Sequence, residues 1–144
     1  MIKRGDEKDI LVLAKLAALM WESHSIGELA EDMAEIMARE DAQFFIKYED
    51  EIPIGFAQCQ LRHDYVEGTE TSPVGYLEGI LVRADYRRRG YARELLQECE
   101  KWAREKGCRE FASDCELVNE ESLRFHMAVG FCEANRIICF TKKL

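Results

Sequence analysis

The feature that most constrains the fold is a buried strand that runs directly into an arginine-rich turn and then a helix. Residues 74–82, VGYLEGILV, are almost wholly apolar, which is typical of a strand buried on both faces of a sheet. Gly79 in the middle of this run indicates a bulge or a splayed edge. The helix expected over 91–106 ends at Gly107, since glycine commonly stops a helix. This order requires a sheet with a helix packed against it.

The rest of the chain alternates between helix and strand patterns, with no linker, repeat or low-complexity segment. The other expected elements are helices over 6–21, 26–39 (capped by Ser25) and 120–129 (capped by Asn119), strands over 42–48, 54–62 and 109–114, and two strands within 131–144 that turn near Ala134 and Asn135. Residues 63–73 read as a polar loop, long enough to border a functional site. These patterns predict one mixed α/β domain spanning residues 1–144.

The chain is acidic, with a formal net charge of −8 over 144 residues. This charge argues against nonspecific binding of nucleic acid and is compatible with a cationic ligand, although acidity also simply keeps proteins soluble. No segment approaches the roughly 20 successive apolar residues of a membrane span, and the charged N-terminus has no apolar signal core. The expected location is therefore the cytoplasm, with no membrane partner.

The cysteines form no C-x-x-C pair and show no zinc-finger spacing. Most have apolar neighbours, so free and mostly buried thiols in a reducing compartment are expected. A metal site made from Cys108, Cys115 and His126 would need a chance convergence of these side chains. No metal is expected.

The arginine-rich turn has the chemistry of an anion site. The first N–H groups of a helix have no partner within the helix, and the helix dipole adds partial positive charge there. Gly90 lets the backbone approach an anion closely, and Arg87, Arg88 and Arg89 supply forked donors that suit phosphate oxygens. The alternative is a basic surface patch partnered by acidic neighbours. Neither G-K-[ST] nor G-x-G-x-x-G is present, which disfavours nucleoside triphosphates and dinucleotides.

Two motifs carry a resemblance to a known family. RRRGYA, 87–92, resembles the coenzyme loop [RQ]-x-x-G-x-[GA] of the GNAT acetyltransferases, and NEESLRFHMAVGF, 119–131, resembles their second coenzyme segment. In the second motif Ser122 replaces a small alanine and His126 replaces the usual tyrosine. Substrate-side segments, including LMWESH, LRHDYVEGTETSPVGYLEGILV and GCREFASD, resemble the homodimeric bacterial aminoglycoside 6′-N-acetyltransferases.

The resemblance implies the fold of that family, a mixed α/β (α+β) domain whose central twisted sheet has about six or seven strands and about four flanking helices. It implies acetyl-coenzyme A as the co-substrate, with its pyrophosphate at the turn and its pantetheine arm along the strand backbone. The implied coenzyme contacts are Leu81, Val82, Arg87, Arg88, Arg89, Gly90, Tyr91, Ala92 and Asn119. It also implies a homodimer and direct acetyl transfer to the 6′-amino group of an aminoglycoside, which would confer resistance.

Glu78 is the leading candidate for the catalytic base. It lies within an otherwise apolar strand, where a carboxylate is costly unless it faces a cleft and is used. It could take the proton of the amine directly or through water, hold the ammonium electrostatically, or simply face solvent. His126 occupies the position from which the family's tyrosine protonates the leaving thiolate, but a histidine on the apolar side of a short helix is often a packing residue.

A polycationic substrate calls for carboxylates and aromatic rings. The resembling enzymes use an aspartate at the position of Asp114 to bind an amino group, and Trp21, His24 and Tyr65 are candidate walls, although Trp21 could equally be core. Two departures, Asn135 and Phe140, affect the expected substrate range and not the coenzyme site. The alternatives are acetylation of another amine, such as a polyamine or a protein N-terminus, or a noncatalytic coenzyme-binding protein.

Overall fold

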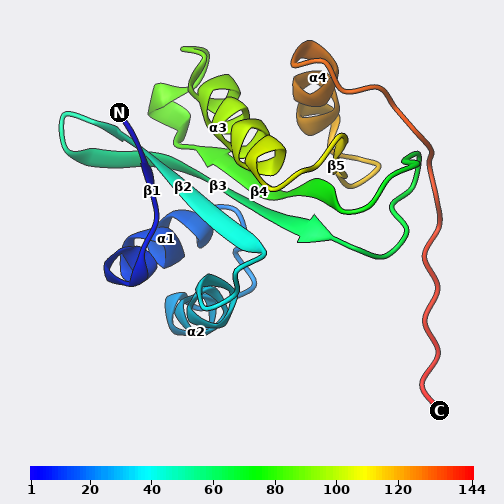
Figure 1. The fold of residues 1–144 in the computed structure, drawn as a ribbon. Coiled ribbons are helices and arrows are strands. Elements are labelled where there is room, and N and C mark those ends of the chain that lie inside the picture. Colours follow the sequence, from blue (N-terminus) through cyan, green and yellow to red (C-terminus); the bar gives the residue numbers. More distant parts are fainter.

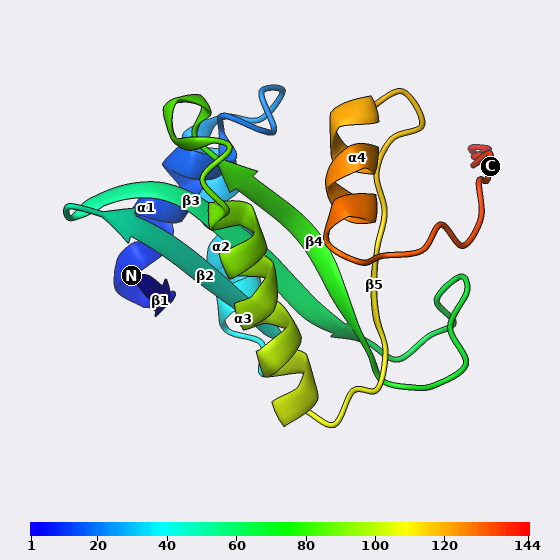
Figure 2. The same ribbon diagram turned by 90° about the horizontal axis from the view of Figure 1, so that it is seen from above.

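The computed structural model describes residues 1–144 and contains a five-stranded sheet with helices on both faces. Helices α1 (Ile10–Ala17) and α2 (Ile26–Met37) cover one face, and α3 (Tyr91–Glu105) and α4 (Glu120–Ala128) lie on the other (Figure 1, Figure 2). Each face has its own apolar core. The core under α3 includes Phe45, Leu77 and Trp102, and the core under α1 and α2 includes Leu13, Met33 and Phe56.

The strands lie in the order β1-β2-β3-β4-β5, antiparallel except for the parallel pair β4–β5. Their bounds are β1 Ile2–Arg4, β2 Ala42–Glu49, β3 Ile52–Arg62, β4 Val74–Val82 and β5 Phe111–Ser113. Short 3₁₀ turns lie at Glu7–Asp9 and Ala84–Tyr86. The expected hairpin, the buried strand and the last three helices are confirmed, with small shifts at their ends. Ser25 caps α2 as expected, in a reciprocal capping box with Glu28.

The first strand, β1, is missed by the sequence patterns. A helix is expected over 6–21, whereas the α-helix begins only at Ile10 and ends at Ala17, after β1 and a 3₁₀ turn. β1 has three residues and pairs with β2, with Lys3 opposite Ile46. A run this short shows no readable alternation, so its strand conformation depends on the tertiary pairing with β2.

The middle of β4 departs from regular pairing on both sides. On the β3 side Gln58 pairs with Gly79 and Cys59 with Leu77, so Glu78 is the extra residue of a β-bulge. On the β5 side the parallel pairing ends at Leu77, and the rest of β4 has no strand beside it. The expectation of a bulged or splayed strand near Gly79 is therefore confirmed. The bulge re-aims Glu78, and the splay leaves one edge of β4 open.

The expected strands within 131–144 are not formed. This segment has neither helix nor strand, and after α4 it runs away from the body of the molecule to the C-terminus (Figure 1). The sheet consequently has five strands, fewer than the six or seven expected. The physical reason is the lack of a pairing partner, since a strand needs a neighbouring backbone to satisfy its N–H and C=O groups. Ile137, Ile138 and Phe140 are 68%, 79% and 87% exposed.

All six cysteines are free. Cys59, Cys99 and Cys108 are buried, whereas Cys115, Cys132 and Cys139 are exposed. The prediction of free thiols is confirmed, but the prediction that most of them are buried is wrong, since Cys132 and Cys139 lie in the C-terminal segment that does not pack and Cys115 lies in the loop between β5 and α4. None of the helices has both the length and the apolar character needed to cross a bilayer.

Candidate active site

The start of α3 offers a row of unpaired backbone donors. The first N–H to bond within the helix region is that of Glu94, to the carbonyl oxygen of Gly90 at 3.1 Å. The N–H groups of residues 88–93 donate no hydrogen bond within the chain. Gly90 has a φ of 80°, and nothing lies within 4 Å of the position a Cβ would take. The turn is therefore an open cradle lined by N–H groups, which suits a phosphate group.

The three arginines of the turn differ in their partners. Arg87 donates from Nε to the carbonyl oxygen of Val82 at 3.1 Å, and its Nη1 lies 3.5 Å from a Glu121 carboxylate oxygen. Arg89 lies 3.6 Å from Glu49. Arg88 has no carboxylate partner and a φ of 63°. Arg88 is therefore the arginine of this turn whose positive charge is most available to an anion.

The remaining residues expected at the coenzyme site lie at the end of β4, in the first turn of α3 and at the start of α4. Val82 is buried in the core under α3, and Leu81 packs against the core under α1 and α2, so only their backbone is available along the open edge of β4. Tyr91 donates its hydroxyl to Glu49 at 3.1 Å, and Ala92 follows it in the first turn of α3. Asn119 caps α4, with its side-chain oxygen accepting from the N–H of Ser122 at 3.1 Å.

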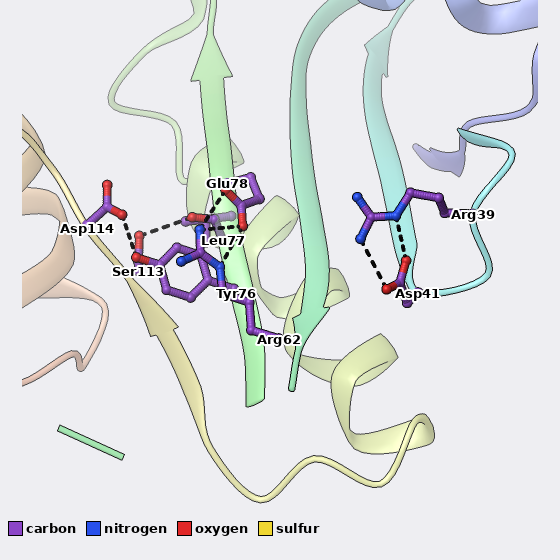
Figure 3. Close-up of polar contacts among 8 residues, drawn as sticks. All are labelled: Arg39, Asp41, Arg62, Tyr76, Leu77, Glu78, Ser113 and Asp114. Atoms are coloured by element: carbon purple, nitrogen blue, oxygen red, sulfur yellow. Dashed lines mark hydrogen bonds and ion pairs between the residues drawn. The ribbon is translucent and has the colours of Figure 1, made fainter. Parts of the chain in front are cut away.

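Glu78 does not stand alone in the strand. Arg62, the last residue of β3, donates to Glu78 Oε1 from Nε at 3.1 Å and from Nη2 at 2.9 Å, and to Oε2 from Nη2 at 3.1 Å (Figure 3). The Glu78 side chain is 20% exposed. This partner explains how a carboxylate is tolerated there, because a charge-assisted forked pair offsets much of the cost of partial burial.

Tyr76 connects this ion pair to Asp114. The Arg62 guanidinium lies 3.5 Å from the centre of the Tyr76 ring, and the Tyr76 hydroxyl donates to Asp114 Oδ2 (Figure 3). Burial, and next the hydrogen bond to Asp114, raise the pKa of Tyr76, so its hydroxyl remains a donor at neutral pH. Glu78 and Asp114, predicted separately, are thus joined through two residues that the sequence patterns did not single out.

The three residues predicted to border the substrate, Trp21, His24 and Tyr65, differ in their surroundings. Trp21 packs against Gly79, since a Cβ there would lie 3.0 Å from its ring, and its ring stacks edge-on to Phe56 at 6.2 Å. His24 is exposed, with Nδ1 3.5 Å from Glu28, and Tyr65 is 75% exposed in the 63–73 loop. Neither His24 nor Tyr65 is hydrogen-bonded to Glu78 or Asp114. Trp21 is therefore the one wall residue that the fold places directly against the strand carrying Glu78.

His126 has both ring nitrogens occupied. Nδ1 lies 2.7 Å from the carbonyl oxygen of Ser122, which can only accept, so Nδ1 carries a proton. Nε2 lies 2.7 Å from Ser113 Oγ, and the ring packs against Phe131 at 5.0 Å. These contacts tie α4 to β5.

No group of three or more metal-ligating side chains is arranged to hold an ion. Cys108 is buried while Cys115 is exposed, so the combination considered with His126 does not converge. A cavity of about 560 Å³ lies elsewhere, lined by Arg4, Gln43 and Trp102 among others, and includes none of the candidate residues.

An open phosphate cradle beside a splayed strand is the arrangement expected for coenzyme A, and residues 13–131 match the acetyltransferase (GNAT) family. The chain is a member of the GNAT acetyltransferase family. An aminoglycoside N(6′)-acetyltransferase type 1 of Salmonella typhimurium is 40% identical to this GNAT chain over 124 residues, 86% of each. One of Serratia marcescens is 37% identical and spans 100% of this chain and 99% of that relative.

A solved structure agrees with these relatives. AAC(6′)-Iy in complex with the bisubstrate analogue CoA-S-monomethyl-acetylneamine superposes with a TM-score of 0.95 at 36% identity, covering 100% of this GNAT chain and 98% of that one. The predicted mixed α/β GNAT fold is confirmed, with fewer strands than expected.

Sequence patterns missed Arg62 and Tyr76 because both depend on the register of β3 against β4. Arg62 is opposite Val74, and Tyr76 lies between Val74 and Glu78 along β4. The arginine side chain must therefore run along the sheet, over Tyr76, to reach Glu78. The one available signal was an arginine ending a strand that pairs with a strand carrying an unexplained glutamate.

Proposed function

We propose that this protein transfers the acetyl group of acetyl-coenzyme A to the 6′-amino group of aminoglycosides, and so confers resistance to them. The observation that carries the proposal is the position of Glu78 on the strand that leads into the open cradle of α3, joined through Arg62 and Tyr76 to Asp114 at the end of β5. The similarity to N(6′)-acetyltransferases over the full length of the chain supports the same activity.

The residues around α3 fit the coenzyme that supplies the acetyl group as a thioester. The N–H groups of residues 88–93 and the Arg88 side chain would hold its pyrophosphate, with Arg87 and Arg89 adding positive charge. The open edge of β4 at Leu81 and Val82 would receive its extended arm through backbone groups. The side-chain amide of Asn119 is free to donate, because only its oxygen is used in capping α4.

The acidic residues bind and activate the substrate amine. In the proposed mechanism Glu78 attracts the substrate ammonium and accepts its proton, directly or through one water, which makes the nitrogen nucleophilic. Asp114 holds a second amino group, and Trp21, His24 and Tyr65 border the substrate. Holding amine and thioester together supplies much of the rate, so direct transfer needs no cysteine nucleophile. The amide C–N bond forms as the thioester C–S bond breaks, and the leaving thiolate takes a proton from solvent.

His126 is proposed to hold α4 against β5 rather than to protonate the leaving thiolate. Its two nitrogens are engaged by Ser122 and Ser113, and its ring by Phe131. A histidine fixed in this way positions Asn119 and the end of β5, and hence both the coenzyme and Asp114.

Arg88→Ala tests the cradle. The expected result is a KM for acetyl-coenzyme A raised by about 10- to 100-fold, the value of one or two charge-assisted hydrogen bonds, with the KM for the amine nearly unchanged. Initial rates at varied coenzyme and at varied amine measure the two parameters. Arg104→Ala, at the far end of α3, is the matched control. A rise in the KM for the amine alone would show that this turn does not bind the coenzyme.

A homodimer is proposed from the C-terminal segment. Residues 137–144 are exposed and carry four large apolar side chains, and the outer edge of β5 pairs with no strand of this chain. Exposed apolar residues beside an open sheet edge favour pairing with a second copy. The proposed compartment is the cytoplasm, where six free thiols stay reduced.

Removing residues 137–144 is expected to convert the dimer into a monomer. Light scattering after size-exclusion chromatography would show the mass of the particle fall to half. The double variant Leu117→Ser/Val118→Ser removes exposed apolar side chains from another loop and is expected to stay dimeric. A dimer that survives the truncation and dissociates in the loop variant would place the interface elsewhere.

The function itself is tested by thiol release from acetyl-coenzyme A with a panel of amines. Kanamycin, its 6′-hydroxyl analogue, spermidine and a peptide cover the alternatives. Fast turnover with kanamycin and none with the hydroxyl analogue is the expected result. Turnover only with spermidine or the peptide would retain the family and reject the aminoglycoside, and coenzyme binding without turnover would indicate a noncatalytic protein.

A further inference from the structure

Arg62 has no assigned role, although it makes more polar contacts with Glu78 than any other side chain. Its guanidinium donates three hydrogen bonds to that carboxylate, two to Oε1 and one to Oε2. An ionised carboxylate has about four lone-pair sites. Arg62 therefore fills three of them and leaves one, on Oε2, for another donor.

The position of Arg62 is itself fixed. Its guanidinium lies over the Tyr76 ring at 3.5 Å, and Tyr76, which is 6% exposed, is held at its other end by Asp114 (Figure 3). A planar guanidinium can stack on a ring and fork onto a carboxylate at the same time, which an ammonium cannot do. The chain Asp114–Tyr76–Arg62–Glu78 thus sets the spacing of the two carboxylates across the splayed strands β4 and β5.

We propose that Arg62 is a positioning residue that aims the free lone pair of Glu78 Oε2 at the substrate amine and, through Tyr76, fixes that oxygen relative to Asp114. Arg62 itself transfers no proton and does not bind the coenzyme. The inference rests on the proposed function, in which Glu78 receives the reacting amine and Asp114 a second amino group.

The charged groups at this site come from four parts of the fold. Asp114 follows β5, Glu78 and Arg62 lie on β4 and β3, and Arg39 lies beyond the end of α2 (Figure 3). Arg39 makes a separate forked pair with Asp41, at 2.8 and 3.0 Å, and donates nothing to Glu78. Arg39 is therefore a matched control, the same kind of ion pair without the contact to Glu78.

The decisive variant is Arg62→Met, which keeps an apolar stem over Tyr76 and removes every donor. The expected result is a fall in kcat/KM for the amine of about 10- to 100-fold, through both kcat and KM, with the dissociation constant for acetyl-coenzyme A unchanged. Arg39→Met is expected to stay within about 2-fold of the wild type, since neighbouring surface ion pairs contribute little. Equal rates in the wild type and Arg62→Met would overturn the proposal.

Two further measurements separate positioning from general stability. Arg62→Lys keeps the charge but loses the planar fork, so its kcat is expected to remain close to that of Arg62→Met. In Arg62→Ala, added guanidinium is expected to restore turnover, whereas methylammonium is not. Restoration by both ions, or full activity in Arg62→Lys, would show that charge alone matters and would contradict the positioning role.

The wild-type protein is assayed first, with kanamycin and acetyl-coenzyme A. If the wild type produces no acetylated amine, the proposed function fails. If it does and the Arg62 variants behave as Arg39→Met does, the function stands and the inference about Arg62 fails.

Discussion

Glu78→Gln is expected to lower kcat for a 6′-amino substrate by about 100- to 10,000-fold, the usual contribution of a positioned general base. Glutamine keeps the size of the side chain and can still accept from Arg62, but it can neither take a proton nor attract an ammonium ion strongly. The affinity for acetyl-coenzyme A should be unchanged, because the cradle at residues 88–93 is separate from Glu78 along β4. Steady-state kinetics and coenzyme titration give the two quantities.

Glu31→Gln, on an exposed position of α2, is the matched control and should behave as the wild type does. The relative changes in kcat and in the KM for the amine decide the role of Glu78. A loss mainly in kcat identifies a base, and a loss mainly in the KM for the amine identifies an electrostatic anchor. A variant with wild-type values of both would remove Glu78 from the mechanism.

Gly90→Val is expected to raise the KM for acetyl-coenzyme A by about 100-fold or more, the loss of several hydrogen bonds to charged oxygens. Gly90 has a φ of 80°, and its missing Cβ faces open space among the free N–H groups of the turn. A valine there strains the left-handed backbone by at least about 1–2 kcal/mol and fills the space that a phosphate would occupy.

The control for Gly90→Val separates strain from blockage. Gly107, after the other end of α3, has a φ of 88° and also has nothing within 4 Å of its missing Cβ. Gly107→Val should therefore lower Tm by a similar amount and leave coenzyme affinity intact. If the two variants bind the coenzyme equally well, the turn before α3 is not the phosphate site.

The sequence predicted the secondary structure correctly wherever the pattern of residues was long and local. The predicted bounds of β4 are the observed ones. Ser25 was correctly identified as the cap of α2, and Gly107 as the residue that stops α3. β1 escaped because three residues show no period, and the strands expected after Phe131 are absent because no backbone lies beside them. The pairing of such segments is decided by tertiary or intersubunit contacts and not by their own residues.

The candidate site was predictable in its residue types but not in its connections. Glu78 stood out as a carboxylate in an apolar strand, and the arginine-rich turn as an anion site, from chemistry alone. The connection between Glu78 and Asp114 could not be predicted, because the bulge at Glu78 and the reach of Arg62 over Tyr76 follow from the β3–β4 register. A one-residue change in that register would turn Arg62 to the other face of the sheet.

The proposed reaction transfers acetyl to one particular nitrogen, so the most direct measurement is the position of the acetyl group in the product. Tobramycin carries several amino groups, and NMR of its product with acetyl-coenzyme A identifies the nitrogen that has reacted. The expected result is a single product acetylated at the 6′-amino group. Acetylation at another nitrogen, or a mixture of positions, would contradict the arrangement in which Glu78 and Asp114 hold two separate amino groups of the substrate.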